Sequence, residues 1–162
     1  MKVLCVVIGA LALAAAASAP AVHQVRMTPS EVISGEKGAS QIGSSKLAGV
    51  HTTILAGDPT APGLYSVLLF VPAHTTIQAH SHRDDRMATV VSGAWEFGYG
   101  TRFAKGALKT LPPGSVYSEP GGVDHFARTT DEPVVVHICG FGPTDTRYFE
   151  PANDPELKRK TP

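Results

Sequence analysis

Cysteine is scarce in this sequence, and neither sign of charge is in excess. Only Cys5 and Cys139 occur among the 162 residues, and the 14 basic residues balance 14 acidic ones. Cys5 and Lys2 lie in an N-terminal segment that we expect to be removed, which leaves 13 basic against 14 acidic residues and no partner for a disulfide. This balance excludes the basic surface that nucleic-acid binding requires. The domain must therefore be held together by its hydrophobic core.

A long apolar run occurs only at the N-terminus. Residues 3–17 are apolar, follow Lys2 and precede several small residues, which is typical of a secretory signal peptide. The run is shorter than the ~20 residues that a membrane-spanning helix needs, so an uncleaved anchor is the weaker alternative. We predict a signal peptide at 1–21, an exported protein that is periplasmic or secreted, and no membrane attachment after cleavage.

The sequence also lacks an apolar repeat of 3.6 residues over three helical turns. From Leu47 onward, short runs of β-type residues such as LYSVLLFV and PVVVHICGF are broken by Gly or Pro about every ten residues. This pattern predicts an all-β barrel or sandwich. The predicted segments are a signal peptide at 1–21, an N-terminal arm at 22–46, a barrel at 47–144 and a polar C-terminal tail at 145–162.

Two histidines stand two residues apart in the stretch AHSHRDDRMATVVSG. Because strand side chains alternate between two faces, His80 and His82 share a face and their imidazoles can converge on one cation. One such pair is a weak sign by itself, since surface strands carry histidines too. A second stretch, GSVYSEPGGVDHFART, adds His125 within a run of turn residues.

Together these stretches resemble the sequence patterns of the cupin superfamily. Cupins have a first pattern of Gly, five residues, His-x-His, three or four residues, Glu, six residues and Gly. Their second pattern is Gly, five residues, Pro-x-Gly, two residues, His, three residues and Asn. The matching residues are His80, His82 and Gly93 in the first pattern and Gly114, Pro120, Gly122 and His125 in the second. The departures are His74 for the first Gly, Arg86 for the Glu and Thr129 for the Asn.

The resemblance covers about residues 45–142 and implies a double-stranded β-helix barrel of the jelly-roll type. It implies one divalent transition metal near the barrel mouth, held by His80, His82 and His125; iron, manganese, zinc, nickel and copper cannot be distinguished. More narrowly, HSHRDDRMATVVSG followed by WEFGYG resembles a group of small exported single-domain cupins. Family analogy also suggests a homodimer.

Arg86 stands where the cupin pattern has a metal-binding glutamate, and a guanidinium cannot be a ligand. In one interpretation it points inward and binds the carboxylate of an anionic substrate. In a second it forms an ion pair with Asp84 or Asp85. In a third, Asp84 or Asp85 replaces the missing carboxylate, and in a fourth the metal site has decayed.

Three further residues are candidates for contact with a substrate. Gln78 shares the period-two parity of His80 and His82. Tyr117 or His137, if directed inward, would place a protonatable group near the metal and favour an enzyme, whereas an apolar lining would favour simple binding. For His137 the alternative is a hydrogen-bonded core residue.

The leading hypothesis from the sequence is an exported, metal-dependent enzyme that acts on a small, anionic organic molecule in a dioxygenase-like reaction. The alternatives are a sugar or uronate isomerase or lyase, and a non-catalytic module that binds a metal or a small ligand.

Overall fold

The computed structural model describes residues 23–34 and 45–160, so the predicted signal peptide at 1–21 lies outside the described residues. Within the described ranges, no helix combines the length and apolar character that crossing a membrane requires.

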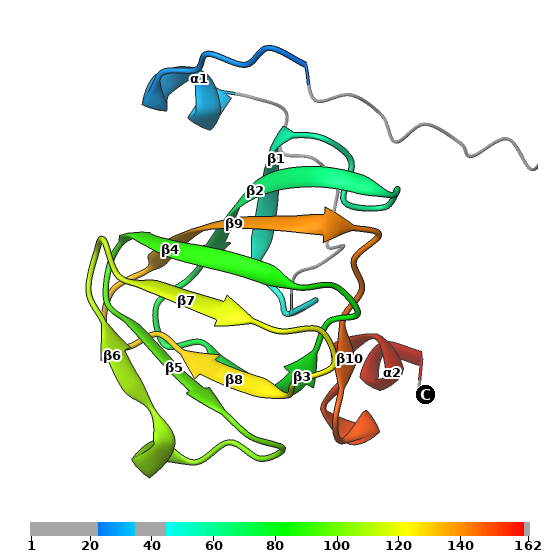
Figure 1. The fold of residues 1–162 in the computed structure, drawn as a ribbon. Helices are drawn as coiled ribbons and strands as arrows, with labels where there is room; N and C mark the ends of the chain where they lie inside the picture. The colour runs from blue at the N-terminus through cyan, green and yellow to red at the C-terminus, as the bar shows by residue number, and fades with distance from the viewer. Residues whose placement is uncertain (1–22, 35–44, 161–162) are drawn as a thin grey trace, which may run out of the picture.

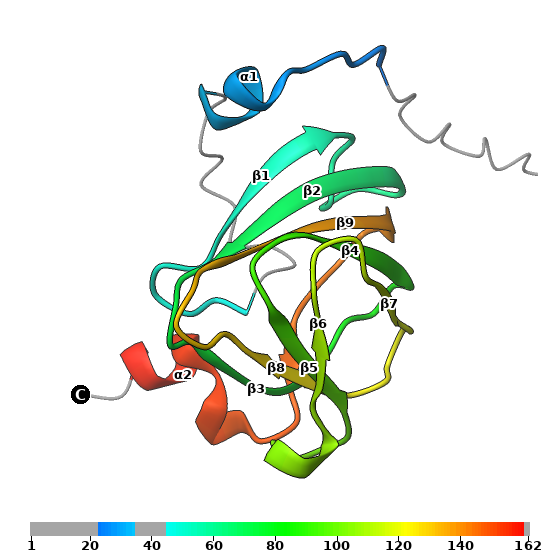
Figure 2. The same ribbon diagram turned by 90° about the vertical axis from the view of Figure 1, so that its left-hand side faces the viewer.

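In the part of the chain that the structure describes, ten strands form two antiparallel sheets that face each other (Figures 1 and 2). The first sheet contains, in order, β1 (His51–Ala56), β2 (Gly63–Val71), β9 (Val134–Gly142), β4 (Arg86–Ser92) and β7 (Val116–Glu119). The second contains β10 (Arg147–Tyr148), β3 (Thr76–Ser81), β8 (His125–Arg128), β5 (Trp95–Tyr99) and β6 (Lys109–Leu111). The helices are α1 (Pro29–Ser34), η1 (Lys105–Ala107), η2 (Pro151–Asn153) and α2 (Pro155–Lys160). The predicted all-β jelly-roll barrel is confirmed.

The core lies between the two sheets and is formed by the inward-facing side chains of their strands. In β2 and β9 every second residue is buried, so that one face of each strand is aliphatic and the other is partly solvated. Val67 and Ile138 lie opposite each other in this pair and are at most 5% exposed. Burial of such side chains supplies the main driving force that a domain without disulfides needs.

Gly93 forms the tight turn between β4 and β5. Its φ of +73° lies in the left-handed region, and a Cβ there would come within 2.3 Å of the carbonyl oxygen of Pro133. Only glycine meets both conditions, so this turn requires glycine at position 93.

Strand pairing continues past residue 144, where the sequence predicts only a polar tail. Residues 147 and 148 form β10, which pairs with β3, and Tyr148 is only 6% exposed. The Tyr148 hydroxyl donates to the carbonyl oxygen of Ser45, and Lys46 forms an ion pair with Glu156 at 3.0 Å. The end of the arm and the tail therefore contact each other.

Candidate metal centre

Three buried histidines converge inside the barrel. His80 lies in β3, His125 lies directly opposite in β8, and His82 follows the end of β3. None is more than 5% exposed, and one ring nitrogen of each lies within 4.8 Å of the others. Of the residues that the structure describes, no other group of His, Cys, Asp or Glu has this arrangement. The fold thus brings together the three residues that the sequence patterns predict as metal ligands.

Backbone carbonyl groups orient all three imidazoles. The acceptors are the carbonyl oxygens of Gln78 for His80 (2.8 Å), Asp145 for His82 (2.5 Å) and Val123 for His125 (3.1 Å). A carbonyl oxygen can only accept, so Nδ1 of each ring carries the proton and Nε2 of each neutral ring has a free lone pair. Metal-binding histidines are oriented in this way by a hydrogen bond from their other nitrogen.

The imidazoles are in the charge state that metal binding requires. Burial, together with the neighbouring His125, lowers the pKa of His80 to about 3. Burial likewise lowers the pKa of His82 and of His125. The Nε2 atoms of His82 and His125 are buried without a hydrogen-bond partner. Such unpaired polar atoms are costly, so neutral rings with unpaired Nε2 atoms fit a bound metal ion.

Arg86 points into the barrel and pairs with a residue that the sequence analysis missed. It lies directly opposite Glu119 in the β4–β7 pair, and its Nε donates to Glu119 Oε2 at 2.7 Å. Both side chains are 4% exposed. The predicted ion pair with Asp84 or Asp85 therefore named the wrong partner, because strand register places position 119 opposite position 86.

Glu119 also faces the histidines. Its Oε2 lies 3.7 Å from His82 Nε2 and 3.8 Å from His125 Nε2. Burial alone would raise the pKa of Glu119, but the charge and hydrogen bond of Arg86, together with the nearby His125 and His80, outweigh it and lower that pKa. Glu119 is therefore an ionised carboxylate inside the barrel. The sequence contains one sign that Glu119 faces inward, because Glu119 shares strand parity with the aromatic Tyr117.

Neither aspartate joins the three histidines. The carboxylate of Asp84 is buried and accepts a hydrogen bond from Tyr65 at 2.6 Å. Asp85 is exposed and accepts from the backbone N–H of Gly121 at 2.8 Å. The structure thus does not support the prediction that Asp84 or Asp85 replaces the missing carboxylate.

Gln78 does not line the metal centre. The β3–β8 pairing has a register shift between Ile77 and His80, so simple alternation from His80 fails at this point. Gln78 is half-buried and instead lines a separate pocket of about 220 Å³ with Arg102 and Glu150.

Tyr117 points inward and His137 points outward. The Tyr117 ring packs 4.3 Å from that of Phe97, and its buried hydroxyl has no hydrogen-bond partner. Burial, reinforced by the charge of Glu119, raises the pKa of Tyr117 well above its usual value, so that this hydroxyl keeps its proton. His137 lies on the outer face of β9, where its Nε2 is 2.7 Å from Ser66 Oγ. His137 is hydrogen-bonded, as its alternative interpretation held, but it does not face the barrel interior.

Two spaces adjoin the histidines. An inner cavity of about 20 Å³ lies beside His80, His125, Arg86 and Glu119, and its other walls are mostly apolar. It has room for a molecule about the size of water. On the side of His82, a pocket of about 310 Å³ is lined by Ser81, His82, Arg83, Gly121, Gly122, Asp145 and Arg147.

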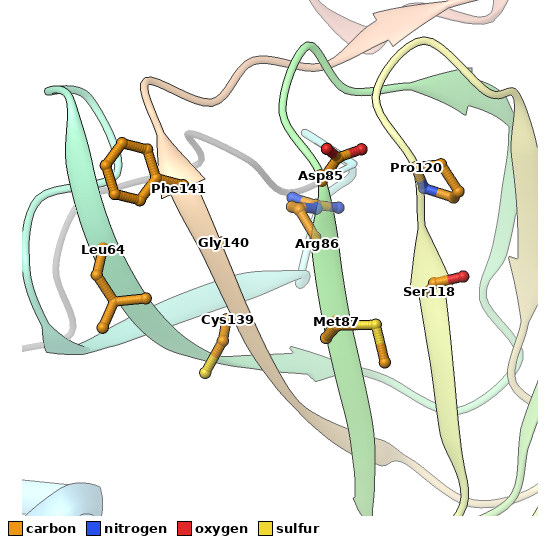
Figure 3. A pocket seen from close by; sticks show the side chains of 9 residues that line it. All are labelled: Leu64, Asp85, Arg86, Met87, Ser118, Pro120, Cys139, Gly140 and Phe141. Atoms are coloured by element: carbon orange, nitrogen blue, oxygen red, sulfur yellow. The ribbon is translucent and has the colours of Figure 1, made fainter.

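A further pocket, of about 430 Å³, lies on the outer face of the first sheet (Figure 3). Leu64, Met87 and Phe141 line it and are more than half exposed. None of the three histidines borders this pocket, so it is separate from the candidate metal centre.

No family model matches the sequence, and no curated protein matches it. Solved structures do match. The polyketide cyclase RemF from Streptomyces resistomycificus is 16% identical, with a TM-score of 0.56 over 70% of this chain and 80% of that one. The DMSP lyase DddQ from Ruegeria pomeroyi is 20% identical, with a TM-score of 0.50 over 74% of this chain.

This chain spans 56% of the length of the DMSP lyase DddQ. An RmlC-like cupin from Shewanella frigidimarina is 19% identical, with a TM-score of 0.48 over 60% of this chain and 80% of that one. At these identities the likeness concerns the fold and not the reaction. The two facing sheets, the strand positions of the three histidines and the matches to the cyclase and the lyase together show that the protein has a cupin fold.

Proposed function

We propose that the protein is a metal-dependent enzyme that binds one divalent transition-metal ion at His80, His82 and His125 and acts on a small organic molecule. The observation that carries this proposal is the convergence of three buried, neutral imidazoles whose Nδ1 atoms are held by backbone carbonyl groups. A bound ion would supply Lewis acidity or, as iron, redox chemistry with dioxygen.

The surroundings of the imidazoles support an organic substrate that approaches from the side of His82. The inner cavity of about 20 Å³ is too small for an organic molecule, whereas the pocket of about 310 Å³ borders His82. That pocket carries Arg83 and Arg147 against one acidic residue, Asp145. Two guanidinium groups favour an anionic substrate. Because Arg86 is engaged with Glu119, these surface arginines replace it as the expected contacts for a substrate carboxylate.

The leading reaction class is dioxygenase-like. The inner cavity is water-sized, lies against His80 and His125, and is otherwise walled mainly by apolar side chains, which suits a small apolar gas. An isomerase or lyase acting on a sugar or uronate is the second candidate. It is favoured by Tyr117, whose buried and protonated hydroxyl is a potential proton donor. A non-catalytic module that binds a metal or a small ligand is the third.

Turnover measurements separate these candidates. The protein would be loaded in turn with iron(II), manganese(II), zinc, nickel and copper and offered small organic acids and uronates, with dioxygen followed by electrode and products by NMR. We expect metal-dependent turnover that is lost in a His80→Ala, His82→Ala double variant. A His51→Ala, His74→Ala variant, with both substitutions outside the site, should keep it.

Each outcome has a distinct meaning. Dioxygen uptake with iron(II) would support the dioxygenase-like reaction, and product formation without dioxygen uptake would support an isomerase or lyase. Ligand binding without turnover under any of these conditions would contradict an enzyme and favour the binding module.

We further propose that the protein is exported and acts as a homodimer. The apolar run at residues 3–17 supports export, and N-terminal sequencing of protein from fractionated cells tests it. Sedimentation equilibrium tests the homodimer, for which family analogy is the support. A mature protein that begins at residue 1, or a monomer at all concentrations, would contradict the respective proposal.

A further inference from the structure

Arg86 brings a positive charge to a position where the cupin pattern has a glutamate. The residue directly opposite in the neighbouring strand is Glu119. A carboxylate is therefore present at the same level of the barrel, but it comes from β7 and not from β4.

Glu119 lies close enough to two of the three imidazoles to share a cation with them. Its Oε2 lies 3.7 and 3.8 Å from the Nε2 atoms of His82 and His125, beyond hydrogen-bond distance. Those two Nε2 atoms are unprotonated and unpaired. Lone pairs on nitrogen and on an ionised carboxylate repel each other in a water-excluded interior, and a shared cation removes that repulsion.

Arg86 fixes the orientation of this carboxylate. Its guanidinium contacts Glu119 Oε2 through both Nε and a terminal nitrogen. Both side chains are buried and lie in adjacent, paired strands, which restricts their rotation. Metal-binding carboxylates are commonly held by a hydrogen-bonding partner of this kind.

We propose that Glu119 is the fourth protein ligand of the metal ion, completing a set of three imidazoles and one carboxylate, and that Arg86 is its positioning residue. This inference rests on the proposed metal site at His80, His82 and His125. It gives the centre the mixed nitrogen and oxygen donors that suit iron, manganese or zinc, and it assigns Arg86 to the protein's own carboxylate instead of a substrate's.

Cobalt(II) binding to the purified, metal-free protein tests this assignment without any assay of activity. Affinity would be measured by competition with a chelator, and the ligand set by the visible absorption of bound cobalt. Replacing Glu119 by Gln keeps its shape but removes the charge. We expect Glu119→Gln to weaken cobalt binding by about 100-fold or more and to change the spectrum.

Two double variants allow for misfolding of Glu119→Gln, which leaves Arg86 buried without its ionised partner. Arg86→Gln with Glu119→Gln makes the pair neutral, and it should bind cobalt as weakly as the single variant. Arg86→Glu with Glu119→Arg restores a carboxylate from the opposite strand. We expect this exchanged pair to bind cobalt within about 10-fold of the wild type, with a similar spectrum.

Different results would overturn the role of Glu119 and the metal site itself. Loss of binding in His80→Ala, His82→Ala together with unchanged affinity and spectrum in the neutral pair would overturn the role of Glu119 alone. A wild-type protein that binds no cobalt, or that binds it equally well without the two histidines, would overturn the metal site itself.

Discussion

Arg86 and Glu119 form an ion pair that is almost completely removed from water. Desolvating two charges costs several kcal/mol per ion, and their attraction often does no more than offset this, so a buried pair is a poor device for stability alone. The pair lies beside three neutral imidazoles, so a chemical role explains its presence better than stability does. The pair keeps a carboxylate ionised where burial alone would favour its protonated form.

Tyr65 supplies the hydrogen bond that makes burial of Asp84 tolerable. The hydroxyl donates to Asp84 Oδ2, while Oδ1 has no partner. We expect Tyr65→Phe to lower the free energy of unfolding by about 1–3 kcal/mol, because it leaves a buried carboxylate unsatisfied. Urea denaturation measures this. The matched control is Tyr99→Phe, which removes a hydroxyl from a residue that is 48% exposed and should cost less. Equal losses would contradict the interpretation.

His74 occupies the position at which the cupin pattern has its first glycine. Its φ is +56°, in the left-handed region that side chains with a Cβ tolerate poorly. We expect His74→Gly to raise the free energy of unfolding by about 0.5–1 kcal/mol, because relief of strain exceeds the added entropy of the unfolded chain. Thermal and urea denaturation provide the measurement. His51→Gly, within strand β1, should destabilise instead, and a loss of stability in His74→Gly would refute the argument.

At the scale of single residues, the sequence predicted the histidines but not their acidic neighbour. Period-two spacing puts His80 and His82 on one face, and a second pattern identifies His125; both relations are local. Glu119 meets Arg86 only through strand register, across 33 positions of the chain. A single sequence contains no direct sign of that pairing, so the partner of Arg86 was assigned to its near neighbours.

At the scale of elements, short β-type runs broken by Gly or Pro predicted the barrel, and irregularities limited the detail. Burial alternates without interruption along the nine residues of β2, but the outward Leu64, Leu68 and Phe70 are also apolar, so the sequence predicts the strand and not its buried face. In β3 the register shift after Ile77 interrupts the alternation of side chains between the two faces, and Gln78 therefore does not point toward the metal centre as predicted. The two-residue strand β10 is too short to show any period, and the tail was predicted only as a polar end.

Strand β10 couples the tail to the metal centre. Tyr148 pairs with His80 across the two strands, and their rings are 5.5 Å apart. We expect Tyr148→Ala to lower the free energy of unfolding by about 3–5 kcal/mol, because it removes a large side chain from the core. It should also weaken cobalt binding, because His80 loses a packing neighbour. Phe149→Ala, at an adjacent residue that is 46% exposed, is the control, and effects of equal size would contradict this role.

At the scale of the whole molecule, burial of neutral imidazoles makes stability depend on pH. The pKa of His80 falls from 6.5 to about 3 in the folded chain, and the pKa values of His82 and His125 are also lowered. Below about pH 6.5 the unfolded chain therefore binds more protons than the folded one, so acid favours unfolding. The stabilisation is complete above that pH and is lost progressively as the pH falls toward 3.

For the metal-free protein we expect the free energy of unfolding to fall between pH 7.5 and 5 by up to ~1.4 kcal/mol per pH unit for each buried histidine. Urea denaturation with a chelator present measures the slope, and staying above pH 5 limits the contribution of carboxylates. A triple variant with glutamine at positions 80, 82 and 125 should show a shallower slope. The same slope in both proteins would show that these histidines do not cause it.

The central claim is that the barrel holds a metal ion at His80, His82 and His125, and elemental analysis tests it most directly. The mature protein would be purified from its native compartment beside the His80→Ala, His82→Ala variant and the His51→Ala, His74→Ala control. We expect about one equivalent of transition metal in the wild type and the control, and none in the first variant. A wild-type protein without metal, or a metal retained after loss of His80 and His82, would contradict it.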